Sequence, residues 1–324
     1  MTTCLLIQPI HHKGIDVLRS AGIEVREASA PGMDVVSEEI VGCDAAITRN
    51  AGLNRAAMDA APTLRVLGNH GIGTDPVDVT YATEIGLPIV FTPYGNVQSV
   101  AELVVSHMLA IARRVREADR AVRSDNYGYR YSRDFVELQG KTLAIIGFGR
   151  IGRRTAEIAK AAFDMRIIAY SPRQDAADIA AAGAEKMDDL AEVLAAADVV
   201  SLHLPLTPET RGMLNRERLG QMKPGSMLIN TARGALVDPA ALIAALDSGH
   251  LRGAAMDVFE VEPLPAAHPF VKEDRLLLSP HIGGATEECL ERTALQTAYQ
   301  VIEVLAGRRP EHLVNPTVWE KRRQ

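Results

Sequence analysis

Three side chains whose types suit the reduction of a carbonyl group follow one another late in the chain. Arg233, Glu262 and His281 each come shortly after an apolar run that predicts a β-strand. An arginine can hold a carboxylate through two hydrogen bonds and polarise a carbonyl, a histidine can exchange a proton near neutral pH, and a carboxylate can orient the histidine ring and raise its pKa. Together the three residues meet the needs of hydride transfer to a 2-oxo acid. Taken singly, each is as readily explained as a structural residue.

A glycine loop earlier in the chain predicts the position of a cofactor. Glycines with the spacing G-x-G-x-x-G follow the strand candidate Thr142–Ile146 and precede a helical pattern over Arg153–Ala162. The chain has 25 glycines, so this context, and not the spacing alone, indicates a dinucleotide site. The missing side chains allow a tight turn, close approach of a pyrophosphate to the backbone, and packing of the helix on the sheet. The expected cofactor contacts here are Gly147, Gly149, Arg150, Ile151 and Gly152.

The end of the next strand bears on the choice between NAD and NADP. An NAD site usually has Asp or Glu about 20 residues after the glycines, where it binds the ribose hydroxyls. Here the strand Arg166–Tyr170 is followed by Ser171-Pro172-Arg173, and an arginine can pair with a 2′-phosphate. The sequence therefore favours NADP(H), with Ser171 and Arg173 as contacts. The alternative is a solvent-facing Arg173 and NAD(H) held by hydroxyl groups.

Composition sets the broad class of the protein. The 324 residues suffice for about two domains, and no apolar run approaches the roughly 18 residues of a membrane span. The first residues lack a basic segment leading into an apolar one, so we expect a cytoplasmic protein. A net charge of −6 argues against a nucleic-acid-binding surface. Three scattered cysteines and unclustered histidines predict neither a disulfide framework nor a metal site.

Short apolar runs alternate with helical patterns along the whole chain. This alternation predicts an α/β fold of two doubly wound parallel sheets covered by helices on both faces. Before the glycine loop the further strand candidates are Cys4–Gln8, Ala45–Thr48, Arg65–Gly68 and Pro88–Thr92; after it they are Met165–Tyr170, Asp198–Leu204, Ser226–Asn230, Ala254–Val258 and Leu276–Ser279.

Several helices carry recognisable start signals. Ser99 and Glu102 form the pattern of a capping box at the start of one long helix that continues to Arg116. Asp238 with Pro239 predicts a second helix that ends before Gly249, and a last long helix is expected over 286–306. The tyrosine-rich segment Ser124–Tyr131 is interpreted as an exposed arm covered by a partner subunit, or as a surface loop.

Two early loops are candidates for binding a small anion. Asn50-Ala51-Gly52 follows Ala45–Thr48, and Gly71-Ile72-Gly73 follows Arg65–Gly68. Ligands of open α/β sheets lie beyond the carboxyl ends of the strands, where backbone N–H groups of such loops are available. On spacing alone, ordinary turns are slightly favoured as the explanation of both loops.

The sequence resembles the D-isomer-specific 2-hydroxyacid dehydrogenase family nearly from end to end. The matching stretches are Gly71–Asp75, Thr92–Asn96, Ser99–Glu102, Gly147–Gly152, Val200–Pro205, Asn230–Gly234, Asp257–Pro263 and Ser279–Gly284. The resemblance implies that Arg233 binds the substrate carboxylate and carbonyl oxygen, that His281 is the acid/base, and that Glu262 orients it. It further implies that Asp257 approaches the nicotinamide. The remaining implied cofactor contacts are His203, Pro205, Thr231, Ala232 and Gly283, and the implied substrate loops are Asn50, Ala51 and Gly52 with Gly71 and Ile72.

The same resemblance implies a Rossmann cofactor domain inserted into a flavodoxin-like substrate domain. The substrate domain is expected over 1–98 and 288–324 and the cofactor domain over 99–287, with hinges at the two crossings. Family members are commonly homodimers joined through the cofactor domain, which is consistent with an arm at Ser124–Tyr131.

Departures from the family pattern bear on the substrate. Arg49-Asn50 and Thr92–Asn96 look like the phosphoglycerate dehydrogenase branch, but Asn69-His70 stands where that branch commonly has an arginine. Reduction of glyoxylate or hydroxypyruvate is therefore favoured, with phosphoglycerate dehydrogenase as the alternative. A nucleotide-sensing scaffold similar to the C-terminal-binding-protein corepressors is an alternative from another class. The formate dehydrogenase branch fits less well, because it pairs its histidine with glutamine where this chain has Glu262.

Overall fold

The computed structural model describes residues 1–323, which form two compact units. Unit 1 combines Met1–Asn96 with the chain from Gly284 onward, and unit 2 is Val97–Gly283. The boundaries fall after residue 96 instead of 98 and before residue 284 instead of 288. The first boundary lies earlier than expected because helix α5 (Val97–Ala112) already begins at Val97. The Ser99 hydroxyl donates to the Gly283 carbonyl (2.7 Å), and this bond joins the first and last segments of unit 2.

Unit 1 contains a five-stranded parallel sheet in the order β2-β1-β3-β4-β5. This order is the flavodoxin-like one, and the parallel α/β class predicted from the sequence is confirmed. Strand β2 was not expected, because an edge strand rich in Glu and Arg carries no apolar signal. The strands are β1 (Thr3–Leu6), β2 (Glu24–Glu27), β3 (Ala45–Thr48), β4 (Val66–Asn69) and β5 (Ile89–Phe91).

A long C-terminal helix covers one face of this sheet. Helix α12 (Glu287–Leu305) begins where Thr286 caps it, as the sequence predicts, and packs against α1 and β4. The contact is close because the facing positions are glycines: a Cβ at Gly14 would lie 2.8 Å from that of Ala294, and one at Gly68 would lie 2.7 Å from Thr297 Cγ2. The other helices of unit 1 are α1 (His12–Ser20), α2 (Met33–Glu39), α3 (Arg55–Ala60), α4 (Val79–Glu84) and the 3₁₀ helix η4 (Pro316–Lys321).

Unit 2 contains a seven-stranded parallel sheet in the order β12-β11-β10-β9-β6-β7-β8. The order runs outward on both sides from the β6/β9 pair, which is the switch point of a Rossmann sheet and a usual place for a dinucleotide. The two-residue edge strand β8 is too short to be recognised in the sequence. The strands are β6 (Thr142–Ile146), β7 (Arg166–Tyr170), β8 (Glu185–Lys186), β9 (Val199–Leu202), β10 (Ser226–Asn230), β11 (Leu251–Met256) and β12 (Leu276–Leu278).

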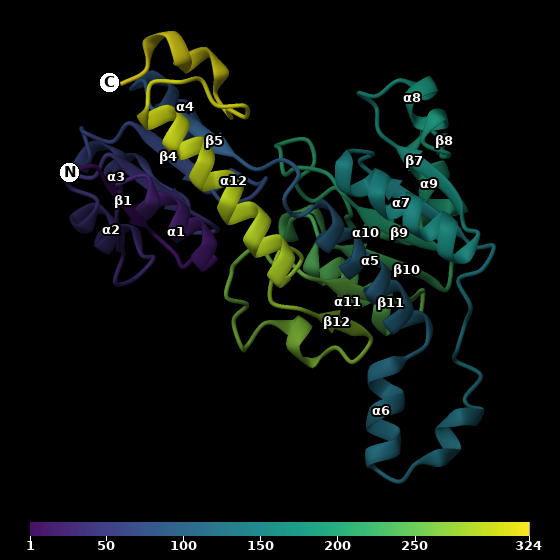
Figure 1. Cartoon of the computed structure of the whole chain (residues 1–324). Helices are drawn as coiled ribbons and strands as arrows, with labels where there is room; N and C mark the ends of the chain where they lie inside the picture. Colours follow the sequence, from purple (N-terminus) through teal and green to yellow (C-terminus); the bar gives the residue numbers. More distant parts are fainter. Residues whose placement is uncertain (324) are drawn as a thin grey trace. The chain divides into compact units, whose positions relative to one another are not determined.

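Helices cover both faces of this second sheet (Figure 1). Alternate residues of β6 enter different cores, with Leu143 and Ile145 packing in the cluster of α5 and α7, and Ala144 and Ile146 in the cluster of α9, α10 and α11. No helix within residues 1–323 combines the length and apolarity needed to cross a membrane. The helices of unit 2 that follow β6 in the chain are α7 (Arg150–Phe163), α8 (Ala176–Ala181), α9 (Leu190–Ala196), α10 (Arg216–Gln221) and α11 (Pro239–Asp247), with 3₁₀ turns η2 (Gly234–Leu236) and η3 (Pro269–Lys272).

The expected single helix from Ser99 to Arg116 is wrong at both ends. The capping box does not form: Ser99 donates to Gly283 O, and Glu102 accepts instead from the amide of Gln98 at 2.5 Å. The helix stops at Ala112, and Arg114 takes a left-handed conformation (φ 49°) before α6 (Val115–Arg123) begins. A left-handed conformation costs free energy for a residue other than glycine, so we expect the side-chain contacts of Arg114 to stabilise it.

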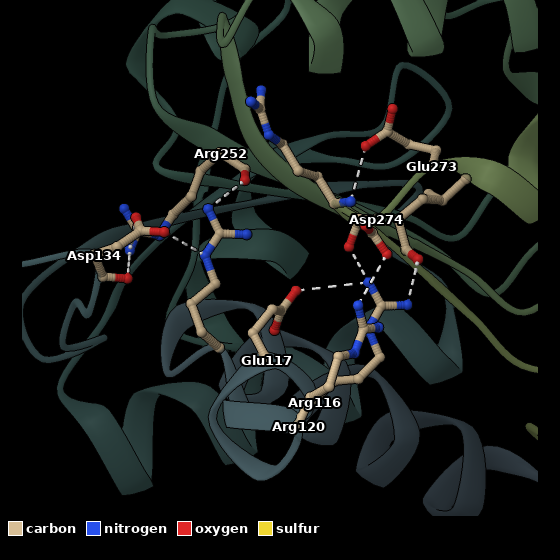
Figure 2. Close-up of polar contacts among 10 residues, drawn as sticks. Arg116, Glu117, Arg120, Asp134, Arg252, Glu273 and Asp274 are labelled. Atoms are coloured by element: carbon tan, nitrogen blue, oxygen red, sulfur yellow. Dashed lines mark hydrogen bonds and ion pairs between the residues drawn. The ribbon is translucent and has the colours of Figure 1, made fainter. Parts of the chain in front are cut away.

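Those contacts form a charged cluster at the base of α6, shown in Figure 2. Asp134 accepts from Arg114 Nε at 2.8 Å and forms an ion pair with Arg252 Nη2 at 3.0 Å. Arg116 donates to the carbonyls of Asp274 and Leu276. The cluster fixes α6 and the following 3₁₀ turn η1 (Tyr127–Tyr131), which project from unit 2 (Figure 1). Predicted helix α11 is confirmed, with Asp238 accepting from the N–H groups of Ala240 and Ala241.

Candidate active site

The catalytic candidates of the sequence all follow strands of the unit 2 sheet. Arg233 follows β10, Glu262 follows β11 and His281 follows β12, while the glycine loop follows β6. Because every strand of this sheet is parallel, the loops after the strands lie along one edge. The topology therefore collects these residues at the carboxyl edge of unit 2.

The glycine loop has room only for backbone at two positions. Gly147 has a φ of 97°, and a Cβ there would lie 2.7 Å from the carbonyl oxygen of His203. A Cβ on Gly152 would meet the carbonyl oxygen of Gly147 at 2.5 Å. These glycines let the turn, the adjoining loop and α7 come together, which is the role the spacing predicts.

The N-terminus of α7 fits a phosphate group. Its N-cap, Gly149, is exposed and has open space where a side chain would project. No side chain caps this end of the helix, so the N–H groups of its first turn point toward that space. Arg150 is also exposed, Ile151 is partly buried, and the buried hydroxyl oxygen of Thr231 has no hydrogen-bond partner within the described residues. The loop and the helix end thus fit the pyrophosphate of a dinucleotide.

The loops on either side of the glycine loop differ in polarity. After β7, Ser171 is partly buried and Arg173 is exposed, and the first carboxylate of the loop is Asp175, directly before α8. After β9, the His203 ring accepts or donates one hydrogen bond to the Ser201 hydroxyl at 2.8 Å. Although part of its surface is exposed, burial of the ring lowers the pKa of His203 to about 4. His203 is therefore neutral at physiological pH.

The Arg233 loop is shaped by the last residue of β10. Asn230 is fully buried; its amide nitrogen donates to the Arg233 carbonyl at 2.8 Å, and its amide oxygen accepts from the N–H of Ala232 at 3.0 Å. The following residue, Gly234, has no room for a side chain, since a Cβ would lie 2.2 Å from the carbonyl carbon of Phe259. This packing sets the direction in which the partly buried Arg233 leaves the sheet.

Asp257 is the centre of the histidine loop. Its buried carboxylate accepts from the Ser279 hydroxyl at 2.6 Å and from the N–H groups of Ile282 at 2.9 Å and Gly283 at 2.9 Å. Its carbonyl accepts from the N–H of His281 at 2.8 Å. The implied contact of Asp257 with the nicotinamide stays a prediction. The observed hydrogen bonds show that Asp257 also holds the backbone of residues 281–283. Gly283 is likewise buried within this network.

His281 and Glu262 form a direct pair. His281 Nδ1 lies 2.8 Å from Glu262 Oε2, and the other carboxylate oxygen accepts from the N–H of Phe259 at 2.9 Å. Burial tends to raise the pKa of Glu262, but the hydrogen bonds from His281 and Phe259 and the charge of Arg233 lower it below its usual value. The carboxylate is therefore ionised near neutral pH and orients a ring whose side chain is about one-third exposed (35%).

The two candidate loops of unit 1 are held by side-chain amides. Gln8 Oε1 accepts from the N–H groups of Arg49 at 3.1 Å and Ala51 at 2.8 Å. Asn69 Nδ2 donates to the carbonyls of Gly71 at 3.1 Å and Gly73 at 3.0 Å. The Ala51 N–H is thus engaged inside unit 1, and so is the N–H of Gly71, which donates to the Asn69 carbonyl at 2.9 Å. Of the predicted carboxylate contacts, Asn50, Gly52 and Ile72 stay predictions as backbone donors.

The roles of several residues that hold these loops could not be predicted from the sequence, although Ser279 and Phe259 lie within matching stretches quoted above. Gln8, Ser279 and Phe259 act through contacts made across the fold, and His107 lies 3.4 Å from the Ser279 hydroxyl from within α5. Asn230 stands in a motif quoted above, yet its role depends on burial. Within residues 1–323 no group of three or more His, Cys, Asp or Glu side chains is arranged to hold a metal ion.

Comparison with known proteins places these features in a family. The chain is 41% identical over 273 residues to a glyoxylate reductase of Thermofilum pendens, covering 83% of this chain and 80% of the relative. It is 37% identical over 316 residues to a D-3-phosphoglycerate dehydrogenase of Methanocaldococcus jannaschii, covering 97% of this chain but only 60% of that relative's length. A crystal structure from Thermus thermophilus aligns with a TM-score of 0.86 at 36% identity, covering 97% of this chain and all of the other. Residues 105–283 match the family model described as "D-isomer specific 2-hydroxyacid dehydrogenase, NAD binding domain", and the chain belongs to this family.

Proposed function

We propose that this protein reduces a small 2-oxo acid to the D-2-hydroxy acid with a nicotinamide dinucleotide. The single observation that carries the proposal is the 2.8 Å pair of His281 Nδ1 and Glu262, beside Arg233 on the edge that holds the glycine loop. A proton donor, a carboxylate that orients it and a cation are the groups that carbonyl reduction requires. The bound dinucleotide supplies the hydride.

Each of the three residues then has a defined role in the reaction. Arg233 binds the substrate carboxylate and polarises the C2 carbonyl. His281 gives a proton to the carbonyl oxygen as the C2 carbonyl π bond breaks, so that an O–H bond forms. A bound reduced nicotinamide would supply the hydride, with its electron pair, for the new C–H bond at C2. Glu262 holds Nδ1 of His281, which leaves Nε2 to face the substrate, and it stabilises the protonated ring.

The favoured substrates are glyoxylate and hydroxypyruvate. A phosphorylated substrate calls for several cations near its phosphate. In unit 1, burial and the charge of Arg49 lower the pKa of His70 to about 4, so this histidine is neutral. Arg49 is itself engaged on the carbonyl of Pro9 at 3.1 Å. Arg49 already donates to a backbone carbonyl, and His70 is neutral. This pair therefore supports a small substrate without a phosphate more than a phosphorylated one.

The proposal is tested with a panel of 2-oxo acids and both reduced cofactors, in the wild type and in Arg233→Lys. The lysine keeps the charge but loses the paired donors, so kcat/KM is expected to fall by about 100-fold or more. Arg216→Lys, on α10, is the matched control and should behave as the wild type. Binding of cofactor without turnover of any 2-oxo acid would remove the enzyme proposal and favour the nucleotide-sensing scaffold instead.

We further propose that NADP(H) is the favoured cofactor and NAD(H) the alternative. The support is the exposed Arg173 after β7 and the absence of a carboxylate at 171–173. Arg173→Ala is expected to lower kcat/KM for NADPH about tenfold and leave that for NADH unchanged. An unchanged ratio of the two values would contradict this assignment.

A homodimer contact on the projecting part of unit 2 is also proposed. Tyr127 and Tyr131 of η1 are 65% and 74% exposed, and Val115 and Val122 of α6 are more than half exposed. A projecting apolar surface of this kind is typical of a protein interface. Sedimentation of Tyr131→Ser with Val122→Ser should show a monomer, whereas a monomeric wild type would contradict the proposal.

A further inference from the structure

Helix α5 carries a histidine on the face that packs into the core of unit 2. His107 is 4% exposed, and its neighbours on this face, Val104, Met108 and Ile111, belong to an apolar cluster. Its Nε2 lies 3.4 Å from the Ser279 hydroxyl oxygen, whereas the buried Nδ1 has no hydrogen-bond partner within the described part of the chain. A buried polar atom without a partner costs free energy, so stability alone would favour an apolar residue at this position.

The hydroxyl group of Ser279 determines which nitrogen of His107 carries the proton. This hydroxyl donates its one hydrogen to Asp257 Oδ1 at 2.6 Å, so toward His107 its oxygen is an acceptor and Nε2 is the donor. Burial lowers the pKa of His107 more than the neighbouring Asp257 raises it, so the ring is neutral near neutral pH. A chain of hydrogen bonds therefore runs from His107 through Ser279 to Asp257.

This chain ends on the backbone of the loop that carries His281. The Asp257 carboxyl group accepts from the N–H groups of Ile282 and Gly283, both at 2.9 Å. The Asp257 carbonyl accepts from the N–H of His281 at 2.8 Å. Helix α5 also contacts this loop directly, because the Ser99 hydroxyl donates to the Gly283 carbonyl at 2.7 Å. Two separate hydrogen-bond routes thus join α5 to the histidine loop.

We infer that His107 is a positioning residue for His281, the proton donor of the proposed reaction. Its Nε2–H group holds the Ser279 hydroxyl in the rotamer that donates to Asp257, and Asp257 fixes the backbone from which His281 projects. This role rests on the proposed function and adds a residue to it that acts only through other side chains. Loss of the ring should therefore loosen the loop without weakening the fold.

Amide hydrogen exchange of residues 281–283 tests the inference without any turnover. His107→Leu keeps a buried side chain of similar size but loses the donor, so these amides are expected to exchange about two- to tenfold faster, the range of one hydrogen bond. His107→Gln, whose amide group can donate from nearly the position of Nε2, should exchange as the wild type does. The denaturation midpoint of His107→Leu should equal or exceed that of the wild type, whereas a merely structural histidine would lower it.

His250→Leu is the matched control for this experiment. His250 directly precedes β11, at the opposite edge of the same sheet, and its Nε2 is likewise buried without a partner among residues 1–323. This change should leave exchange at 281–283 unaltered. In a Ser279→Ala background, His107→Leu should have no further effect, because the route passes through that hydroxyl. Exchange that is unchanged in His107→Leu, or that rises equally with and without Ser279, would overturn the inference.

Turnover gives a second readout, which depends on the proposed function. With a 2-oxo acid that the wild type reduces, kcat of His107→Leu is expected to fall about tenfold, because small displacements of a reacting group are costly. His107→Gln should restore most of this loss. An unchanged kcat alongside faster exchange would overturn the link to the proton donor. A wild type that reduces no 2-oxo acid would remove the proposed function, and the exchange rates would still decide whether His107 holds the loop.

Discussion

The carboxyl edges of the two sheets are built from different chemistry. In unit 2 the loops are joined through carboxyl groups: Asp257 accepts three hydrogen bonds and Glu262 holds His281. In unit 1 the loops at the same edge are joined through neutral amides, those of Gln8 and Asn69. Amides fix a backbone without adding charge, so unit 1 is suited to presenting backbone donors, whereas unit 2 is suited to moving protons and stabilising charge.

Replacement of His281 tests most directly whether the loops of unit 2 transfer protons. His281→Asn keeps a polar side chain but cannot exchange a proton, so kcat is expected to fall by about 10³-fold while the Kd for the reduced cofactor stays unchanged. His268→Asn is the control, because that histidine accepts a hydrogen bond from Phe270 N elsewhere in unit 2. A kcat within a few-fold of the wild type would show that His281 is not the proton donor.

Loss of the Asp257 carboxyl should lower the stability of the protein far more than loss of the Ser279 hydroxyl that donates to it. Asp257→Ala leaves two buried N–H groups and a hydroxyl without their acceptor, so the free energy of unfolding is expected to drop by on the order of 3 kcal/mol. Ser279→Ala removes one of these bonds and should cost about 1 kcal/mol. Chemical denaturation followed by circular dichroism measures both, and equal losses would contradict the central role of Asp257.

The neutral His203 predicts a pH dependence of stability. Its pKa in the folded protein is about 4, below the value of about 6.5 for the unfolded chain. Between these values the unfolded chain binds more protons, so stability falls as the pH falls through this window. Relative to His203→Gln, the wild type should lose at most about 2 kcal/mol of unfolding free energy between pH 7 and pH 5. Parallel stability curves for the two proteins would mean that the ring stays accessible to protons.

The smallest effect is expected from an amide of unit 1. Gln8→Leu removes the acceptor of the Arg49 and Ala51 N–H groups, so the loop loosens and KM for the 2-oxo acid should rise about threefold to tenfold with little change in kcat. Asn54→Ala removes the cap of the neighbouring helix α3 and is the control for stability alone. A fall in kcat without a change in KM would place this loop among the catalytic elements instead.

The sequence predicted the elements whose signals are local. Strands Ala45–Thr48, Thr142–Ile146 and Ser226–Asn230 were expected with the bounds they have, because each is a buried apolar run ended by a polar or glycine residue. The cap of α11 was equally clear, and the range expected for α12 differs from the observed one by one residue at each end. The edge strands β2 and β8 were missed because they are polar or short.

The errors have a common cause in contacts that are distant in sequence. The spacing of Ser99 and Glu102 predicts an N-cap, but the Ser99 hydroxyl donates a hydrogen bond to the Gly283 carbonyl, 184 positions away along the chain. The apolar stripe that continues to Arg116 predicted one unbroken helix, but the helix breaks at Arg114. The Arg114 side chain donates to Asp134 and to the carbonyl of Arg252 at this break. A local pattern cannot show where such partners lie.

The sequence by itself determined the α/β class and the glycine loop, and it predicted Arg233, Glu262 and His281 as the catalytic set, because these depend on residue type and on position directly after an apolar run. Only the tertiary structure decided that Glu262 reaches Nδ1 of His281 and that the Asp257 carboxylate accepts the N–H groups of the histidine loop. These relations join loops from different strands, and their strength depends on distance and burial, which exist only once the sheet has formed.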